Sequence, residues 1–202
     1  MMRLVFASNN AHKLAEVRAM MPEGISVLSL SEIGFEDEID ETGTTLEENS
    51  AIKADAVYQW LTANGEWRKV DGVFADDTGL EINALGGKPG VYTARWAGEP
   101  AANRQKALAE LKDKTDRSAQ FRTVITLIKF SAISDQYSET QVSGIVRGRI
   151  AEEEYGQGGF GYDPVFIPEG YNKTFGELPA EVKNSISHRS RALAELVKLL
   201  NC

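Results

Sequence analysis

The stretch from Phe74 to Gly98 constrains the fold of this chain more than any other segment. The apolar residues at its start predict the end of a buried strand that leads into two adjacent carboxylates, Asp76 and Asp77, at a Thr-Gly turn. Ligands bind in α/β sheets where strands end, and an Asp pair there suits a divalent cation. A plain Asx turn that ends the strand is the alternative. The glycines that follow predict a loop whose backbone approaches a ligand closely: Gly86, Gly87, Gly90 and Gly98.

Length and composition predict one soluble globular domain over residues 1–202, with a cleft. No linker or low-complexity tract interrupts it, and 42% apolar with 26% charged residues is the balance of a folded protein. The apolar run 4–7 is too short for a signal sequence or a membrane span, and the only cysteine is Cys202. We therefore expect a cytoplasmic protein with no intrachain disulfide and no membrane partner.

The net charge of −8 argues against long duplex nucleic acid as a partner, because such binding relies on an excess of Lys and Arg. A small polyanion is still compatible with this charge. It would require a local cluster of cations or a metal ion, and the sequence offers candidates for both.

The N-terminal segment predicts a buried strand over Arg3–Ala7 and a helix over Ala11–Met20. Between them, Ser and Asn residues can cap a helix whose free N–H groups and positive dipole end would receive a phosphate, with Lys13 in the first turn. The glycines and the Lys-Ser/Thr pair of a P-loop are missing. Ordinary helix capping with a solvated Lys13 is the alternative.

A second strand is predicted over Ile25–Leu30, followed by an acidic loop over 36–44. Most such charge runs are solvated, but one carboxylate could complete a cation site with the Asp pair. Thr45 and Glu48 form a capping box that opens a helix to about Thr62. Its inner face is expected to hold Ile52, Ala56 and Trp60, and Lys53 is expected to face either solvent or the cleft.

The rest of the chain completes an α/β pattern. A helix is expected over Ala101–Lys112, and a strand over Ala119–Phe130 that pairs antiparallel with Tyr137–Arg149 across a turn around Ser134-Asp135. A closing helix is expected to end near Leu200. The core candidates of the long strand are Val124, Ile125, Leu127 and Ile128.

Two C-terminal segments carry further candidate chemistry. In the glycine-rich run 156–168, Phe160 can stack on a base and Asp163 can accept hydrogen bonds from a ring N–H, although a tight hairpin with a buried Phe is the alternative. His188 and Arg189 lie at the start of the closing helix, with Ser187 as its cap. Positive residues oppose the helix dipole there, which favours an anionic or carbonyl partner.

Taken together, these motifs resemble those of the inosine triphosphate pyrophosphatase family, the dITP/XTP pyrophosphatases. The resemblance covers nearly the whole chain, and although each motif is weak alone, their order and spacing are specific. The motifs are Ser8-Asn9-Asn10 to Lys13, Glu41-Thr42-Gly43 with Glu48-Asn49, Ala75-Asp-Asp-Thr-Gly79, Leu85-Gly-Gly-Lys-Pro-Gly90, Gly158-Gly-Phe-Gly-Tyr-Asp-Pro164 and Ser187-His-Arg189.

The resemblance implies an α/β fold with an elongated mixed β-sheet flanked by helices and two lobes around a central cleft, usually as a homodimer. It implies Mg²⁺-dependent hydrolysis of ITP, dITP or XTP to the monophosphate and pyrophosphate. The implied general base and metal ligand is Asp77. Where family members often carry Glu, this chain has Asp40, so either Asp40 or Glu41 is the second metal ligand.

The resemblance also implies which residues bind substrate. The triphosphate would be held by Ser8, Asn9, Asn10, Ala11, His12 and Lys13. Contacts to the rest of the nucleotide would come from Thr78, Phe160, Gly161, Tyr162, Asp163, Lys183, His188 and Arg189. A 6-keto purine offers an acceptor to His188 or Arg189, whereas adenine presents an amino group that would leave buried donors unpaired.

Two other classes of function remain open. A non-catalytic nucleotide-binding regulatory protein would keep the pocket and would be expected to lose Asp77 or Lys13, but both are present. Single-stranded RNA binding through the Phe160 loop is disfavoured by the negative net charge.

Overall fold

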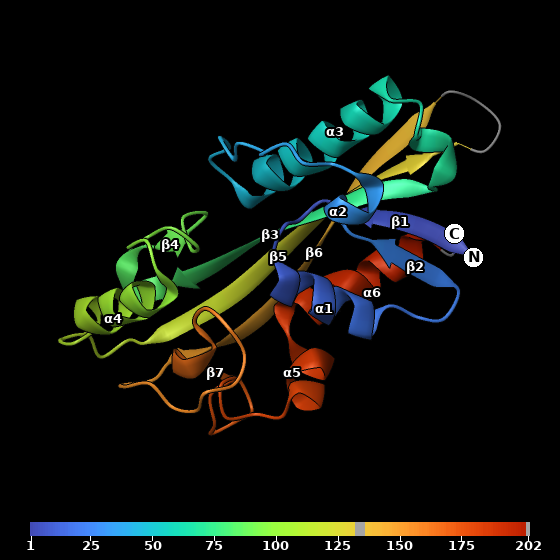
Figure 1. Ribbon diagram of the computed structural model, residues 1–202. Coiled ribbons are helices and arrows are strands. Elements are labelled where there is room, and N and C mark those ends of the chain that lie inside the picture. Colours follow the sequence, from blue (N-terminus) through green and yellow to red (C-terminus); the bar gives the residue numbers. More distant parts are fainter. Residues whose placement is uncertain (132–135, 201–202) are drawn as a thin grey trace. The chain divides into compact units, whose positions relative to one another are not determined.

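The computed structural model describes residues 1–131 and 136–200 as a mixed α/β fold (Figure 1). The strands are β1 (Met2–Phe6), β2 (Ile25–Leu28), β3 (Gly72–Ile82), β4 (Pro89–Gly90), β5 (Ser118–Phe130), β6 (Tyr137–Ile150) and β7 (Phe166–Pro168). The α-helices are α1 (Ala11–Met20), α2 (Leu30–Ile33), α3 (Leu46–Ala63), α4 (Pro100–Glu110), α5 (Ala180–Ile186) and α6 (His188–Leu200). Short 3₁₀ turns are η1 (Trp67–Lys69), η2 (Asn83–Leu85) and η3 (Asp163–Val165).

The strands form one seven-stranded sheet in the order β2-β1-β3-β5-β6-β7, with β4 paired to β3. Strand β1 runs parallel to both β2 and β3, whereas β4 is antiparallel to β3 and β7 is antiparallel to β6. The predicted fold class, a mixed sheet flanked by helices, is therefore confirmed. Among the described residues, we find no helical segment with the length and hydropathy that a bilayer crossing demands.

The chain divides into two compact units. Unit 1 contains residues 1–77, 124–143 and 192–202, and unit 2 contains residues 78–123 and 144–191. Strands β3, β5 and β6 and helix α6 each contribute residues to both units.

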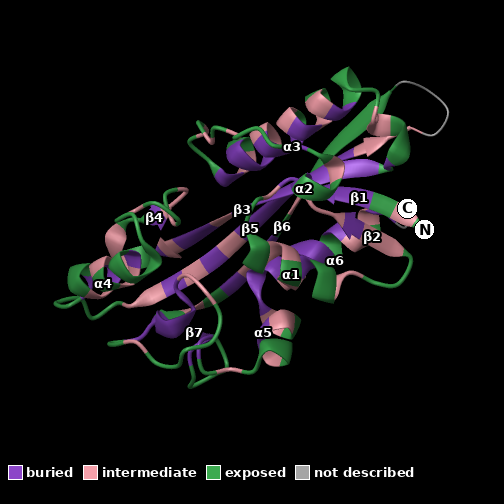
Figure 2. Cartoon of the chain, viewed as in Figure 1, coloured by how far each residue is buried: buried purple, intermediate pink, exposed green. Residues whose placement is uncertain are grey.

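In unit 1, the sheet is covered by α3 on one face and by α1 and α6 on the other. The alternation of strand residues decides which cover each side chain meets. Val5, Val73 and Ala75 pack with α3, whereas Phe6 and Phe74 pack with α1 and α6. All five are fully buried (Figure 2). The predicted core residues of β5 are also buried, namely Val124, Ile125, Leu127 and Ile128.

Unit 2 has its own core on one face of the same strands. Leu80 and Ile82 of β3 pack there with Phe121 of β5 and with Ala107 and Leu111 of the α4 segment. Strand β3 is therefore buried on both faces over residues 72–77 in unit 1, and it adds Leu80 and Ile82 to the core of unit 2.

Several sequence-based predictions about these elements are wrong. Asp76 and Asp77 do not lie in a turn, because β3 continues to Ile82. Strand β2 ends at Leu28 and is followed by α2, whose N-cap Ser29 forms a capping box with Glu32. Helix α5 was not expected. The predicted turn around Ser134-Asp135 and the residue Cys202 lie outside the described residues.

The inner face of α3 also differs from the prediction. Its capping box of Thr45 and Glu48 is confirmed, but Ile52, Ala56 and Trp60 are only partly buried. The buried residues of the helix are Leu46, Asn49, Ser50, Lys53, Ala54, Val57 and Leu61. The inner face therefore combines apolar residues with three polar ones, Asn49, Ser50 and Lys53, which contact β3.

Candidate active site

Successive side chains of β3 point to opposite faces of the sheet, so its two carboxylates have different partners. Asp77 follows Val73 and Ala75 on the face covered by α3, whereas Asp76 follows Phe74 on the face covered by α1. Accordingly, Lys13 of α1 donates from Nζ to Asp76 Oδ1 at 2.8 Å. The side chain of Asp76 is 1% exposed, so this cation balances a buried charge.

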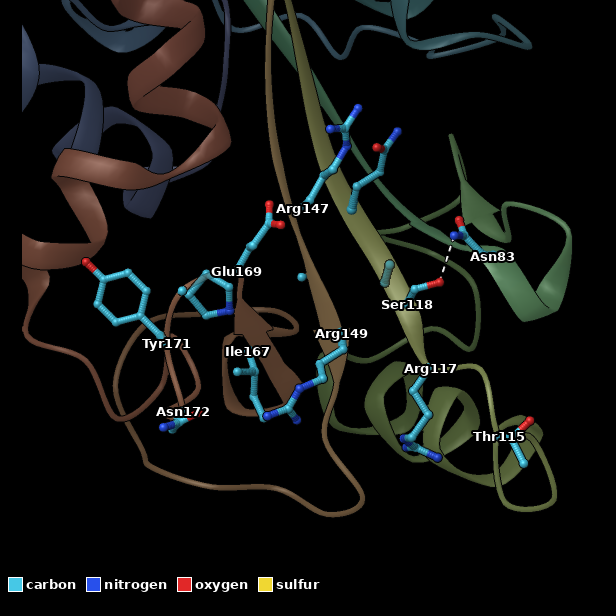
Figure 3. A pocket seen from close by; sticks show the side chains of 15 residues that line it. Asn83, Thr115, Arg117, Ser118, Arg147, Arg149, Ile167, Glu169, Tyr171 and Asn172 are labelled. Atoms are coloured by element: carbon cyan, nitrogen blue, oxygen red, sulfur yellow. Dashed lines mark hydrogen bonds between the residues drawn. The ribbon is translucent and has the colours of Figure 1, made fainter.

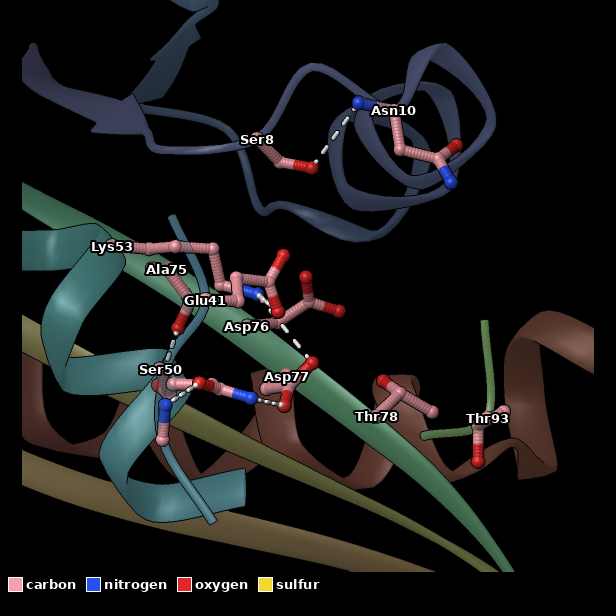
Figure 4. A network of polar contacts seen from close by, with 12 residues as sticks. Ser8, Asn10, Glu41, Ser50, Lys53, Ala75, Asp76, Asp77, Thr78 and Thr93 are labelled. Carbon is pink, nitrogen blue, oxygen red and sulfur yellow. Dashed lines mark hydrogen bonds and ion pairs between the residues drawn. The ribbon is translucent and has the colours of Figure 1, made fainter. Parts of the chain in front are cut away.

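Asp77 lies among residues of α3 and the acidic loop (Figure 4). Asn49 Nδ2 donates to Asp77 Oδ2 at 3.4 Å, and Lys53 Nζ lies 3.4 Å from Asp77 Oδ1. The same ammonium group lies 3.2 Å from Glu41 Oε2. The ammonium group of Lys53 therefore lies between two carboxylates from separate segments, Asp77 of β3 and Glu41 of the acidic loop.

Burial raises the pKa of Asp77 above the usual range of an aspartate. The charges of Lys53 and Lys13 act in the opposite direction, and those of Glu41 and Asp76 add to the rise. A buried carboxylate with a raised pKa holds a proton more readily than a solvated one, which is a property of a general base.

Asn49 connects Asp77 to the acidic loop. Its Oδ1 accepts the backbone N–H of Gly43 at 2.8 Å while its Nδ2 faces Asp77. A Cβ at Gly43 would lie 2.6 Å from that Oδ1, so only glycine fits this close approach. One amide thus sets the position of both the loop and the carboxylate.

A buried hydroxyl pair fixes α3 against the sheet one turn from Lys53. Ser50 Oγ lies 2.7 Å from Thr126 Oγ1, donates to the carbonyl of Ala75 at 3.0 Å and accepts the N–H of Thr126 at 2.8 Å. These contacts join α3 to β3 and β5. They hold Asn49 and Lys53 on the side of the helix that meets Asp77.

The acidic loop offers two neighbouring carboxylates to a metal ion. Glu41 reaches Lys53 and thereby the surroundings of Asp77, whereas the side chain of Asp40 is exposed. The geometry therefore favours Glu41 over Asp40 as a partner of Asp77.

The donor set fits Mg²⁺ only with ligands from outside the chain. Among the described residues, no three His, Cys, Asp or Glu side chains gather into a metal-binding group. Glu41 and Asp77, which share Lys53, can supply two carboxylates. Mg²⁺ is commonly held by one or two carboxylates together with substrate phosphates and waters, so two carboxylates are sufficient.

The segment predicted to bind phosphate, Ser8 to Lys13, forms an ordinary helix cap in the structure. Asn10 Oδ1 accepts the N–H groups of His12 at 3.0 Å and Lys13 at 3.2 Å, and Ser8 Oγ accepts the N–H of Asn10 at 3.2 Å. The side chain of Asn10 therefore caps the first turn of α1. Asn9, Ala11 and His12 are exposed.

In unit 2, Asp163 gathers the predicted base-binding residues. Its Oδ2 accepts the N–H of Phe160 and the Nζ of Lys183, both at 2.7 Å. Lys183 Nζ lies 4.7 Å from the centroid of the Phe160 ring, and Arg189 Cζ lies 5.6 Å from it. Phe160 thus has two cations near its ring, and both side chains are buried.

His188 and Thr78 contact β5 of unit 2. The imidazole of His188 stacks on Phe121 with a centroid distance of 4.7 Å and an interplanar angle of 21°. Thr78 Oγ1 lies 2.8 Å from Thr123 Oγ1. Burial raises the pKa of the Tyr162 phenol, whose hydroxyl donates to the carbonyl of Thr93 at 3.2 Å.

A pocket of about 880 Å³ in unit 2 is lined by none of the predicted site residues (Figure 3). It lies on the face of β5 and β6 that carries Gln120, Arg147 and Arg149. We assign no part of the candidate active site to it.

Sequence reasoning missed the roles of several residues that the structure places in these clusters. Asn49 and Lys53 stand four residues apart on α3, a spacing that puts them on one helix face, and this signal could have linked them. Phe121 and Thr123 come from a strand that looked purely structural, and no local pattern identified them.

Comparison with known proteins identifies the family of this chain. A family model described as the Ham1 family matches residues 4–199. The chain belongs to the Ham1 family. The match spans both units.

Curated relatives align along the whole chain. One from Flavobacterium johnsoniae, named dITP/XTP pyrophosphatase, is 48% identical over 202 residues and covers 98% of each chain. One from Bacillus subtilis with the same name is 46% identical over 207 residues, covering 99% of this chain and 98% of the relative.

Solved Ham1 structures agree with the fold. The Staphylococcus aureus Ham1 protein has a TM-score of 0.82 at 39% identity, with 98% of each chain covered. A HAM1 protein from Coxiella burnetii has a TM-score of 0.84 at 37% identity, covering 100% of this chain and 99% of the other.

Proposed function

We propose that this Ham1-family protein hydrolyses ITP, dITP and XTP to the nucleoside monophosphate and pyrophosphate, and so removes deaminated purines from the nucleotide pool. The observation that carries the proposal is Asp77, a buried carboxylate flanked by Asn49 and Lys53. Support also comes from relatives named dITP/XTP pyrophosphatase that align over the whole chain.

In this proposal, Asp77 acts as the general base. It takes a proton from a water molecule whose oxygen bonds to the α-phosphorus, while the bond from that phosphorus to the bridging oxygen breaks and pyrophosphate leaves. Asn49 and Lys53 fix the orientation of the carboxylate. Such displacements depend mainly on positioning and charge stabilisation, which fixed side chains supply.

The triphosphate brings about four negative charges to an acidic chain, so cations must be concentrated locally. We assign its binding to the segment from Ser8 to Lys13, with Lys13 supplying charge. Asp77 and Glu41 would hold Mg²⁺, which when bound neutralises phosphate charge and favours the attacking water. Asp40 is the less favoured second ligand because its side chain is exposed.

The base would be held by the segment from Phe160 to Asp163 in unit 2, with Thr78 as a further nucleotide contact. Phe160 offers a ring for stacking, with the buried donors Lys183 and Arg189 near it. His188 is a further buried donor, which stacks on Phe121. A 6-keto group can accept a hydrogen bond from His188 or Arg189, whereas the 6-amino group of adenine cannot. We further propose that residues 1–202 act as one catalytic domain in a cytoplasmic homodimer.

Substrate preference tests this function. We expect kcat/KM for ITP, dITP and XTP to exceed that for ATP by about 100-fold or more, because adenine leaves buried donors unpaired. The measurement is pyrophosphate release by the purified protein with Mg²⁺ over a panel of nucleoside triphosphates. Equal rates for ITP and ATP would contradict the specificity, and ITP binding without product would favour the non-catalytic alternative.

Metal removal tests the assignment of Mg²⁺. Chelation with EDTA is expected to lower the rate of ITP turnover by about 1000-fold, since a catalytic metal contributes several kcal/mol of charge stabilisation. Titration with MgCl₂ should restore the rate, and circular dichroism should show that the fold persists throughout. Full activity in EDTA would rule out a metal requirement.

A further inference from the structure

Helix α4 contacts the loop that carries Phe160 through Arg104. The guanidinium Nη1 of Arg104 donates to the backbone carbonyl of Gly161 at 2.9 Å, a contact between residues 57 positions apart in the sequence. The side chain of Arg104 is only 17% exposed, so the hydrogen bond is partly shielded from water. A charged donor in such a place makes a stronger hydrogen bond than a neutral one.

Glu154 holds the guanidinium from the other side. Its Oε2 lies 2.9 Å from Arg104 Nε as an ion pair, and its Oε1 accepts from Gln105 Nε2 at 3.0 Å. Two atoms of the guanidinium therefore have different partners: Nε forms an ion pair with Glu154 without a hydrogen bond, and Nη1 donates a hydrogen bond to the backbone of the loop. Gln105 also contacts Glu154 but, within the described part of the chain, makes no hydrogen bond to the loop, which makes it a matched control.

Glycines on both sides of Phe160 give the backbone of this loop a conformational freedom that the Arg104 contact restricts. Gly159 and Gly161 have φ of 73° and 62°, in the left-handed region that glycine adopts freely. A Cβ at Gly161 would meet nothing within 4 Å, so side-chain packing does not confine this residue. Two side chains instead bind successive parts of the loop, Asp163 at the N–H of Phe160 and Arg104 at the carbonyl of Gly161.

The residue before Arg104 holds a second segment of unit 2. Asn103 is 2% exposed, and its amide donates to the carbonyls of Thr93 and Ala94. The carbonyl of Thr93 also accepts the hydroxyl of Tyr162, which follows Gly161. The start of α4 thus fixes the aromatic loop directly through Arg104 and indirectly through Thr93.

We propose that Arg104, oriented by Glu154, is a positioning residue for the nucleobase. It holds the peptide of Gly161 so that the ring of Phe160 stays in place beside Lys183 and Arg189, and it does not touch the substrate itself. This inference rests on the proposed function and adds a determinant of base binding that lies outside the family motifs. Loss of Arg104 weakens binding of the base and leaves binding of the phosphates intact.

The test compares Arg104→Met with Gln105→Met. For each variant, KM and kcat are measured with ITP, together with the inhibition constant of inorganic tripolyphosphate, which has no base. Arg104→Met is expected to raise KM about 10-fold, the cost of one charge-assisted hydrogen bond, with kcat within about two-fold. The inhibition constant should not change, Gln105→Met should behave as wild type, and Arg104→Lys should recover part of the loss.

Hydrogen–deuterium exchange provides a readout that needs no activity. Amides of residues 156–166 should exchange faster in Arg104→Met and at the wild-type rate in Gln105→Met. If wild type hydrolyses ITP while Arg104→Met keeps its KM and its exchange rates, the positioning role is wrong and the proposed function stands. An equal loss of ITP and tripolyphosphate binding would also overturn it. If wild type does not hydrolyse ITP, the proposed function fails, and unchanged exchange would then reject the Arg104 contact separately.

Discussion

Replacement of Asp77 with Asn is expected to lower kcat for ITP hydrolysis by about 1000-fold or more, because the amide can neither accept a proton from water nor bind a cation as a carboxylate does. The amide has nearly the same shape, and its one oxygen can keep the contact with either Lys53 or Asn49, while Glu41 still pairs with Lys53. The loss should therefore appear in kcat rather than in folding. Pyrophosphate release with saturating ITP and Mg²⁺ measures it.

The matched control is Asp55→Asn, which removes a carboxylate from an exposed position of α3. It should leave kcat within about two-fold, since exposed substitutions far from a site have small effects. Full activity in Asp77→Asn would remove Asp77 from the role of base. Equal losses in both variants would point to net charge as the cause rather than to one carboxylate.

The same substitution should not destabilise the metal-free protein. Burial raises the pKa of Asp77, so the folded state disfavours the ionised carboxylate relative to the unfolded state. Wild type therefore loses stability as pH rises above the unfolded-state pKa of about 3.9. Asp77→Asn cannot ionise and avoids this loss, so at pH 7 its free energy of unfolding should equal or exceed that of wild type. Urea unfolding in EDTA measures both free energies, and the difference between Asp77→Asn and wild type should be smaller at pH 4 than at pH 7.

The sequence predicted those parts of the fold that local patterns determine. The capping box of Thr45 and Glu48 opens α3 because both partners lie within one turn. The apolar content of the long strands was also sufficient to place β5 and β6 and the core residues of β5. The turn predicted at Asp76 and Asp77 was wrong because long-range cations stabilise a continuous strand there. Lys13 reaches Asp76 from 63 positions away.

The candidate site was predicted as a set of residue types, without its internal contacts. The apolar pattern predicted Ile52, Ala56 and Trp60 on the inner face of α3. In the structure Lys53 and other polar residues face β3, where Lys53 offsets the charge of the buried Asp77. The contact of Arg104 with a backbone carbonyl has no sequence signal, since any residue supplies such an acceptor. Pairings of this kind become visible only when distant segments have been placed in space.

Replacement of Lys183 with Met is expected to lower the free energy of unfolding by about 3 kcal/mol, because it removes the Lys183 cation that pairs with the buried carboxylate of Asp163. The two side chains are 6% and 5% exposed, and their charged atoms lie 2.7 Å apart. Urea unfolding at pH 7 gives the value. The control is Lys198→Met, whose ammonium group pairs with Glu195 at 2.7 Å on a side chain that is 69% exposed, and which should change stability by less than about 0.5 kcal/mol.

A double-mutant cycle separates the ion pair from other effects of the substitution. Asp163→Asn in the Lys183→Met background should restore part of the loss, because no uncompensated charge then remains, and the coupling energy should be about 2 kcal/mol. The amide oxygen introduced by Asp163→Asn can still accept the N–H of Phe160, so the loop keeps this anchor as well as Arg104. Additive effects of the two substitutions would mean that the pair contributes little. Stability, and with it the position of Phe160, would then have to come from the packing of unit 2 and from Arg104.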